Sequence, residues 1–154
     1  MGGCHCGNIR LAYSTHVEPS AIEPRACDCS FCQKHGAAYI SDPAGALVIA
    51  AADPRALHRY RQGSNTAEFL ICDRCGVVAA VLVDHHARLY GAVNARCLDA
   101  FADFGPAVPA SPQQLAASEK LARWLRLWVP DVELVTDESA IAIDGSPLRD
   151  SNRS

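Results

Sequence analysis

The sequence predicts a mainly β domain of short antiparallel strands, with a C-terminal helix and a small hairpin. Three observations predict this fold class. Short apolar segments alternate with turn-forming residues through the first 100 residues, most cysteines stand in closely spaced groups, and a helical pattern of apolar residues appears only after residue 111. The chain has 154 residues, the length of one ordinary domain.

Composition excludes several classes of protein. The chain is 49% hydrophobic and 20% charged, with a formal net charge of -3, so it is neither a disordered tail nor an electrostatic nucleic-acid binder. The start MGGCHCGNIR has no basic segment followed by an apolar one, and no stretch approaches the roughly 18 apolar residues that a membrane span needs. We therefore expect a soluble, cytoplasmic protein with neither a nucleic-acid nor a membrane partner.

The first expected strand covers residues 8–13, directly after Cys4-His5-Cys6-Gly7, where the glycine permits a tight turn. Residues 16–24 contain two prolines and are expected to form a loop. Further strands are expected at residues 37–40, 46–51, 57–60, 67–72, 77–83 and 88–94. Turns are expected at 63–65, 75–76 and 84–86. Short strands separated by turns favour an antiparallel arrangement.

The composition changes after residue 99. Residues 101–112 contain three prolines and a glycine, which is typical of a linker. Ser111 then has the character of a helix N-cap, with Pro112 in the first turn and Gln114 completing a capping box. The apolar face of this helix has helical spacing and consists of Leu121, Trp124, Leu125 and Trp128.

Pro130 is expected to end this helix, and residues 132–135 and 140–143 to form one more hairpin. The sequence thus predicts a β domain over residues 1–100, a helix and hairpin extension packed on it over 101–144, and a disordered tail over 145–154. The extension could cover a pocket, form a face for a homo-oligomer, or do neither.

Seven of the eight cysteines stand in tight groups. Partners two or three residues apart gain little as disulfides, because the loops are short and the bridge geometry is strained. Such spacings suit metal chelation better, since C-x-C and C-x-x-C turns present both sulfurs to one ion. The groups are Cys4 with Cys6, Cys27 with Cys29 and Cys32, and Cys72 with Cys75.

The seven cysteines divide into four and three. Four ligands complete a structural zinc site, whereas a catalytic zinc has three protein ligands and an open position. The two doublets are expected to form the structural site, and the triplet the catalytic one, giving two zinc ions per chain. The alternative for the doublets is a set of buried free thiols.

Two residues could close the triplet site and make it structural. His35 lies three residues after Cys32. Cys97 could reach the triplet from a distance, although a lone cysteine after an apolar strand is more typical of a core. The spacing therefore leaves open whether the third group is catalytic or closed.

The chain carries four motifs in order: G-G-C-H-C-G, C-D-C-S-F-C-x-K-H-G, C-D-R-C-G and A-V-N-A-R-C-L-D. Over about residues 2–99 this pattern resembles the glutathione-dependent formaldehyde-activating family, which includes centromere protein V relatives. The resemblance implies a zinc-bound β-tent in which Cys4, Cys6, Cys72 and Cys75 bind structural zinc and Cys27, Cys29 and Cys32 bind catalytic zinc. It also implies a carbon-sulfur lyase that joins glutathione to formaldehyde, as an S-(hydroxymethyl)glutathione synthase does.

Glutathione is an anionic co-substrate, so its binding needs cations beside a thiolate-rich site. Arg96 and Lys34 are the cations nearest the motifs, and Asn94 offers a further hydrogen bond. Each has an alternative reading, because the two cations could be solvated surface charges and Asn94 could cap its turn. The expected partners are a small-molecule thiol and a small aldehyde.

Three functions remain open from the sequence. The first is an enzyme acting on a thiol and an aldehyde at the triplet. The second is a non-catalytic, zinc-stabilised binding module in which His35 or Cys97 closes the triplet. The third is a redox-responsive thiol protein that releases zinc on oxidation.

Overall fold

The structure is a computed structural model that describes residues 1–136. Within these residues the strands are β1 (Gly2–Gly3), β2 (Ile9–Ser14), β3 (Arg25–Cys27), β4 (Ala38–Ile40), β5 (Ala46–Ala51), β6 (Leu57–Arg61), β7 (Glu68–Cys72), β8 (Val78–His85), β9 (Arg88–Asn94), β10 (Val108–Ala110) and β11 (Glu133–Val135). The α-helices are α1 (Ser30–His35) and α2 (Ala117–Leu127). Short 3-10 turns cover Pro19–Ala21, Pro54–Ala56, Ala95–Cys97, Asp99–Asp103 and Pro112–Gln114.

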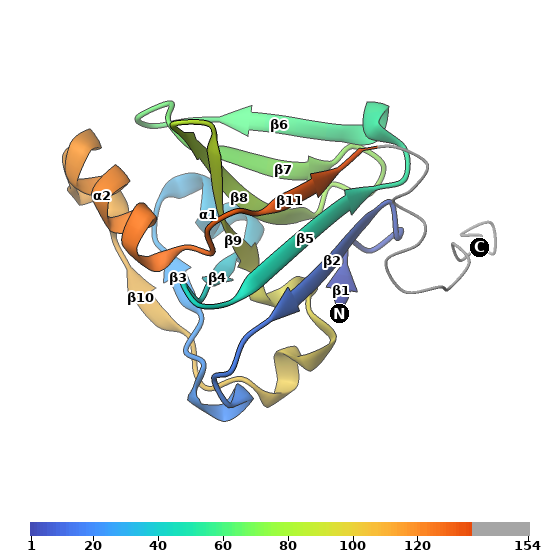
Figure 1. The fold of residues 1–154 in the computed structure, drawn as a ribbon, viewed down its shortest axis with the longest axis horizontal. Helices are drawn as coiled ribbons and strands as arrows, with labels where there is room; N and C mark the ends of the chain where they lie inside the picture. The colour runs from blue at the N-terminus through green and yellow to red at the C-terminus, as the bar shows by residue number, and fades with distance from the viewer. Residues whose placement is uncertain (137–154) are drawn as a thin grey trace.

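The strands form two sheets (Figure 1). The small sheet has the order β1-β2-β5-β11, and the large sheet has the order β10-β3-β4-β9-β8-β7-β6. Most neighbouring strands are antiparallel, but β10 is parallel to β3 and β11 is parallel to β5. The predicted mainly β fold with a C-terminal helix is therefore confirmed.

The centre of the large sheet is covered on both faces, and β8 shows this most clearly. Ala80 and Leu82 belong to a core cluster that also contains Ile49 of the small sheet. Val81 and Val83 point to the opposite face, where they join a second cluster with Trp128. Because both faces are buried, residues 77–83 form an unbroken apolar run instead of an alternating pattern.

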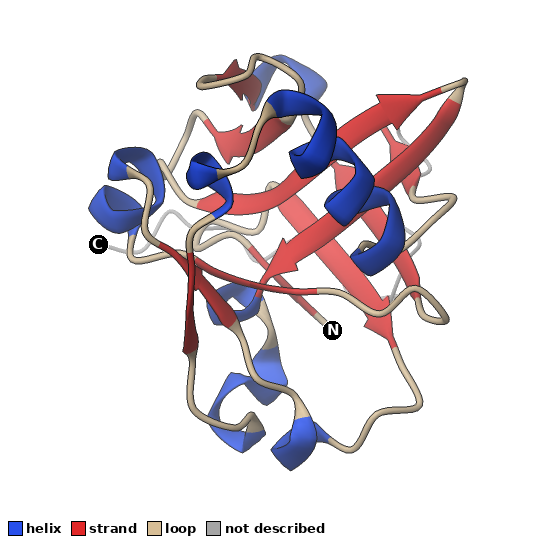
Figure 2. Ribbon diagram, turned by 90° about the vertical axis from the view of Figure 1, so that its left-hand side faces the viewer, coloured by secondary structure: helices blue, strands red, loops and turns tan. Residues whose placement is uncertain are grey.

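Helix α2 closes the second of these faces. In Figure 2 the side that carries α2 faces the viewer, and the helix lies in front of the strands. Leu121, Trp124 and Trp128 contribute to the cluster on this face as predicted, with Leu127 taking the place expected for Leu125. No helix within residues 1–136 combines the length and the hydropathy needed to cross a membrane.

The helix begins later than the sequence predicts. Residues Pro112–Gln114 form a separate 3-10 turn, and α2 starts at Ala117, where the side chain of Glu119 accepts a hydrogen bond from the Ala116 N–H at 3.0 Å. Ser111 does not cap a helix, because its hydroxyl donates to the carboxylate of Asp28 at 2.6 Å. The Ser111 hydroxyl thus forms a long-range hydrogen bond to Asp28 instead of the predicted N-cap hydrogen bond.

The expected linker over residues 101–112 is also more ordered than predicted. It contains the end of the 3-10 turn Asp99–Asp103 and strand β10, which pairs with β3. The expected hairpin is replaced, in its first half, by β11 pairing in parallel with β5. Its second half, residues 140–143, and the expected tail, 145–154, lie outside the described residues.

Candidate metal centres

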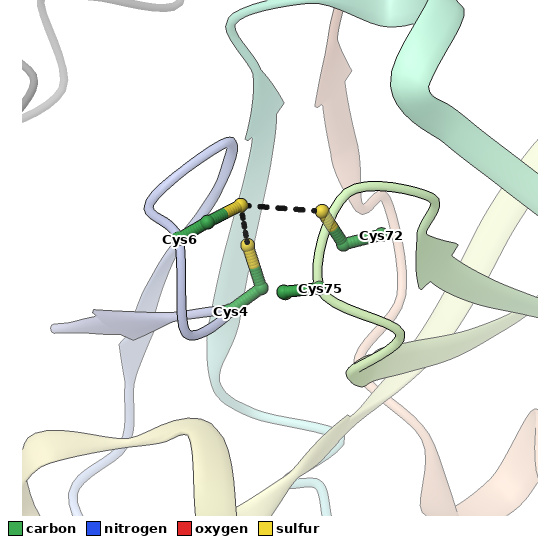
Figure 3. A group of neighbouring side chains, drawn as sticks. All are labelled: Cys4, Cys6, Cys72 and Cys75. Carbon is green, nitrogen blue, oxygen red and sulfur yellow. Dashed lines mark hydrogen bonds between the residues drawn. The ribbon is translucent and has the colours of Figure 1, made fainter. Parts of the chain in front are cut away.

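The two cysteine doublets come together as one four-cysteine group. Cys4 and Cys6 lie in the turn before β2, Cys72 is the last residue of β7, and Cys75 lies in the turn between β7 and β8 (Figure 3). The four sulfurs all lie within 4.8 Å of one another. The Sγ atoms of Cys6 and Cys4 are 3.7 Å apart, and those of Cys6 and Cys72 are 3.5 Å apart. All four are free thiols.

Each of the two turns in this group contains a glycine with positive φ directly after the doublet. Gly7 and Gly76 each follow the second cysteine of a doublet and have φ of 79° and 74°, a left-handed conformation that glycine adopts without strain. The Gly7 N–H donates to the carbonyl of Cys4 at 3.1 Å, and the Gly76 N–H donates to that of Cys72 at 2.7 Å. These tight turns bring the two sulfurs of each doublet to one side.

The four-cysteine group fits zinc. A tetrahedron of sulfurs, each about 2.3 Å from a zinc ion, has edges of about 3.8 Å, close to the measured separations. Burial raises the pKa values of Cys4 and Cys72. For Cys75 burial is outweighed by the N–H groups of Cys6 and Val77, which bring its pKa to about 7. A cation is the natural counterion for buried sulfurs that must ionise together.

The cysteine triplet forms the second group, and its three sulfurs also lie within 4.8 Å of one another. Cys27 is the last residue of β3, Cys29 is the N-cap of α1, and Cys32 lies in the first turn of that helix. The Cys29 sulfur accepts a hydrogen bond from the Cys32 N–H at 3.5 Å. The end of β3 and the start of α1 thus bring the three sulfurs together at one site.

Sequence reasoning did not predict α1. The sequence feature that could have predicted this helix is its C-terminal end. Two basic residues, Lys34 and His35, occupy the last turn, and Gly36 follows them and ends the helix with φ of 58°. The helix has only 6 residues, too few for a clear apolar period.

The pKa values of Cys27 and Cys32 shift in opposite directions. The hydrogen bond from Cys32 brings the pKa of Cys27 to about 6, and the same bond together with burial raises that of Cys32. The hydroxyl of Tyr39 lies 3.6 Å from the Cys32 sulfur, and burial raises the pKa of Tyr39, so that the hydroxyl keeps its proton. The amide Nε2 of Gln62 donates to the Cys29 sulfur at 3.7 Å.

Neither residue that could close the triplet belongs to its group. His35 is exposed and packs its ring on Phe31 with centroids 4.6 Å apart. Cys97 is buried in the core, where its thiol donates to the carbonyl of Val78 at 3.5 Å and burial raises its pKa to about 11. Among the described residues, no histidine, cysteine or carboxylate supplies a fourth ligand to the triplet.

A cavity opens beside the triplet. All three sulfur-bearing residues line it, and so do Tyr39 and Gln62. Its apolar wall comes from the large sheet and from α2, and consists of Phe69, Val81, Trp124, Leu127 and Trp128. The rings of Trp124 and Trp128 are stacked, with centroids 4.9 Å apart. The extension after residue 100 therefore covers one side of a pocket.

The residues named for glutathione binding lie elsewhere. Arg96 is exposed, donates to the carbonyl of Gly36 at 2.6 Å and packs over Phe101. Asn94 is buried, donates to the carbonyl of Val78 at 2.8 Å and accepts from the Arg96 N–H. Lys34 is exposed on α1. None of the three lines the cavity.

Among residues 1–136, three other cations line the cavity: Arg25, Lys120 and Arg123. Arg25 is partly buried and donates to the hydroxyl of Ser41 at 2.5 Å. Burial and then the positive charge of Arg123 lower the pKa of Arg25. Sequence reasoning missed these cations, because two of them lie on α2, far along the chain from the cysteine motifs.

Comparison with known proteins agrees with this description. The family model for the glutathione-dependent formaldehyde-activating enzyme matches residues 1–111. A crystal structure of a Rhodobacter sphaeroides protein, a structural genomics target, aligns with a TM-score of 0.51 and 23% sequence identity. That alignment covers 70% of this chain and 98% of the other. At this level of identity the structural likeness supports the fold alone.

Proposed function

The chain belongs to the family of glutathione-dependent formaldehyde-activating enzymes, and from this premise we propose that it is a zinc-dependent carbon-sulfur lyase. It joins glutathione, or a similar thiol, to formaldehyde or another small aldehyde. Cys27, Cys29 and Cys32 hold the catalytic zinc, while Cys4, Cys6, Cys72 and Cys75 hold a structural one. The chain thus carries two zinc ions.

One observation carries the proposal. The three-cysteine group opens onto a cavity, and within residues 1–136 no fourth ligand closes it. A zinc site with three protein ligands and an accessible position is the arrangement that catalytic sites use, whereas structural sites have four ligands. The four-cysteine group supplies the contrasting case in the same chain.

The reaction adds a thiol across a carbonyl group. A carbon–sulfur bond forms, the carbonyl π bond breaks, and the thiol proton ends on the former carbonyl oxygen. Zinc bound at the triplet supplies Lewis acidity, which favours a thiolate and polarises a carbonyl oxygen. Tyr39 keeps its proton, and its hydroxyl lies 3.6 Å from the Cys32 sulfur, so it can donate a hydrogen bond to that zinc ligand.

Ionisation of the thiol alone gives limited acceleration. A free thiol with a pKa of about 8.5 is about 3% thiolate at pH 7, so complete ionisation raises the nucleophile roughly thirtyfold at most. Larger factors come from holding the two reactants in the reactive geometry. The apolar walls of the cavity exclude water from that geometry, and the side chains around it orient the thiol.

The test is a glutathione titration of cobalt-substituted protein, together with a measurement of adduct formation by NMR. We expect two metal ions per chain, a change in the cobalt spectrum at one of them, and adduct formation faster than in buffer. Two metal ions that do not respond to thiols, without catalysis, would support the zinc-stabilised binding module instead. Cys97→Ser is the matched control, because Cys97 lies outside both groups and serine can donate the same hydrogen bond to Val78.

A further inference from the structure

The cavity beside the triplet carries positive charge that no carboxylate of the described chain neutralises. Arg25 comes from β3, and Lys120 and Arg123 come from α2. All three are partly buried. The two cations of α2 lie beyond residues 1–111, the part of the chain that the family model matches. They are features of this chain's own extension.

This cationic set differs from five arginines of the described chain. Arg55, Arg59, Arg61, Arg74 and Arg88 all form ion pairs with carboxylates at the surface. Within residues 1–136, by contrast, Arg25, Lys120 and Arg123 form no ion pair. Asp28, which lies between Cys27 and Cys29, is already bound by Ser111 and Gln113.

Arg25 is fixed by a hydrogen bond but keeps N–H donors with which it can bind a ligand. Its Nη2 donates to the hydroxyl of Ser41, and that hydroxyl donates in turn to the carbonyl of Leu127 at 2.7 Å. A guanidinium group has five N–H donors, and only one hydrogen bond from Arg25 is made to the described chain. The same link fastens the end of α2 to the large sheet, so the cations of both elements face one space.

The position of Arg25 in β3 brings its positive charge close to the sulfurs of the triplet. Arg25 and Cys27 are two residues apart in β3, so their side chains leave the same face of the strand, about 7 Å apart along the chain. A carboxylate bound by Arg25 is therefore within reach of a small thiol whose sulfur points to the triplet. The apolar wall of Trp124 and Leu127 lowers the local dielectric constant and strengthens such an ion pair.

The extent of the cavity lining points to the larger of the two reactants. Side chains of β3, β4, β7, β8 and α2 all line it, a wall more extensive than formaldehyde alone would contact. We propose that Arg25, Arg123 and Lys120 bind a carboxylate of the thiol substrate and direct its sulfur toward the triplet. On this reading, which rests on the proposed function, α2 is the element that selects anionic thiols over neutral ones.

The selectivity test uses Arg123→Gln and three thiols: glutathione, its diethyl ester and 2-mercaptoethanol. The ester retains the size of glutathione but has no carboxylate. We expect the ratio of kcat/KM for glutathione to that for the ester to fall about 10- to 100-fold in Arg123→Gln, the loss typical of a charge-assisted hydrogen bond. Arg126→Gln is the control, because Arg126 is exposed on the same helix and does not line the cavity.

A binding measurement separates this inference from the reaction. S-methylglutathione has both carboxylates but no reactive thiol, and the only two tryptophans of the chain, Trp124 and Trp128, line the cavity and report on it by fluorescence. We expect the ligand to bind the wild type and Arg126→Gln, and to bind Arg123→Gln about 10- to 100-fold more weakly. Binding that depends on Arg123, without turnover, would overturn the lyase and support the carboxylate site. Turnover with an unchanged selectivity ratio would overturn the carboxylate site alone.

Discussion

Tyr39 is the side chain that supports the triplet most directly. Its hydroxyl lies 3.6 Å from the Cys32 sulfur and is buried beneath the cavity. With Cys32 ionised, the hydroxyl can only donate, and a hydrogen bond to a ligand atom stabilises that atom in its metal-binding form. We expect Tyr39→Phe to lower the affinity of the triplet for zinc about 10- to 100-fold. Competition with a chromophoric chelator measures this affinity.

The control for this substitution is Tyr90→Phe. Tyr90 is partly buried in β9, lies 5.5 Å below the guanidinium carbon of Arg88, and does not line the cavity. Its loss of a hydroxyl should leave both metal sites unchanged. Equal zinc affinity in Tyr39→Phe and wild type would show that the hydroxyl does not act on the ligand.

Only some of the residues around the triplet could be predicted from the sequence. The three cysteines lie within six consecutive positions, so their spacing alone predicts that they share a site. Tyr39 and Gln62 reach the same sulfurs from β4 and from the loop before β7. No local pattern marks either residue, because their position depends on how the strands pair.

The hairpin between β8 and β9 contains a strained element. Its two-residue turn, His86 and Ala87, has φ of 51° and 59°, and His85 pairs with Arg88 on either side. A turn with positive φ at both positions favours Asn-Gly, because a side chain with Cβ is strained there. We expect Ala87→Gly to raise the free energy of unfolding by about 0.5–1 kcal/mol. Urea denaturation with an unchanged m-value measures this.

The same exchange in a helix provides the matched control. Ala122 is exposed in the middle of α2, where glycine costs about 1 kcal/mol relative to alanine. Ala122→Gly should therefore destabilise the protein while Ala87→Gly stabilises it. Two changes of the same sign would contradict the strain assigned to the turn.

The elements that sequence reasoning placed correctly are those with a strong local pattern. The apolar runs at 46–51 and 77–83 became β5 and β8, with bounds shifted by two residues or fewer at each end. The start of α2 was wrong, since Ser111 and Gln113 bind Asp28 and the chain turns once more before the helix. Parallel pairing of β10 with β3 also depends on partners far apart in sequence.

The two cysteine groups affect the whole molecule differently. The four-cysteine group joins the N-terminal turn before β2, in the small sheet, to the hairpin turn of β7 and β8, in the large sheet. The triplet instead lies within one continuous stretch between β3 and α1. A cross-link between distant segments constrains the unfolded chain much more than a local one does.

Metal removal should therefore act on stability mainly through the four-cysteine group. We expect Cys75→Ser to lower the melting temperature by more than about 10 °C, because several kcal/mol of metal-coupled folding energy are lost from a domain of this size. Cys29→Ser should shift it by only a few degrees, about what 1 kcal/mol produces. Serine at position 29 also keeps a side chain suited to the N-cap of α1.

Chelation measured by calorimetry distinguishes the two groups further. A strong chelator should lower the melting temperature of wild type and of Cys29→Ser by similar amounts, since both retain the four-cysteine group. In Cys75→Ser the chelator should have little further effect, because the stabilising ion is already absent. If Cys29→Ser unfolds as readily as Cys75→Ser, the triplet is also structural, and the cavity beside it loses the open ligand position on which the proposed chemistry depends.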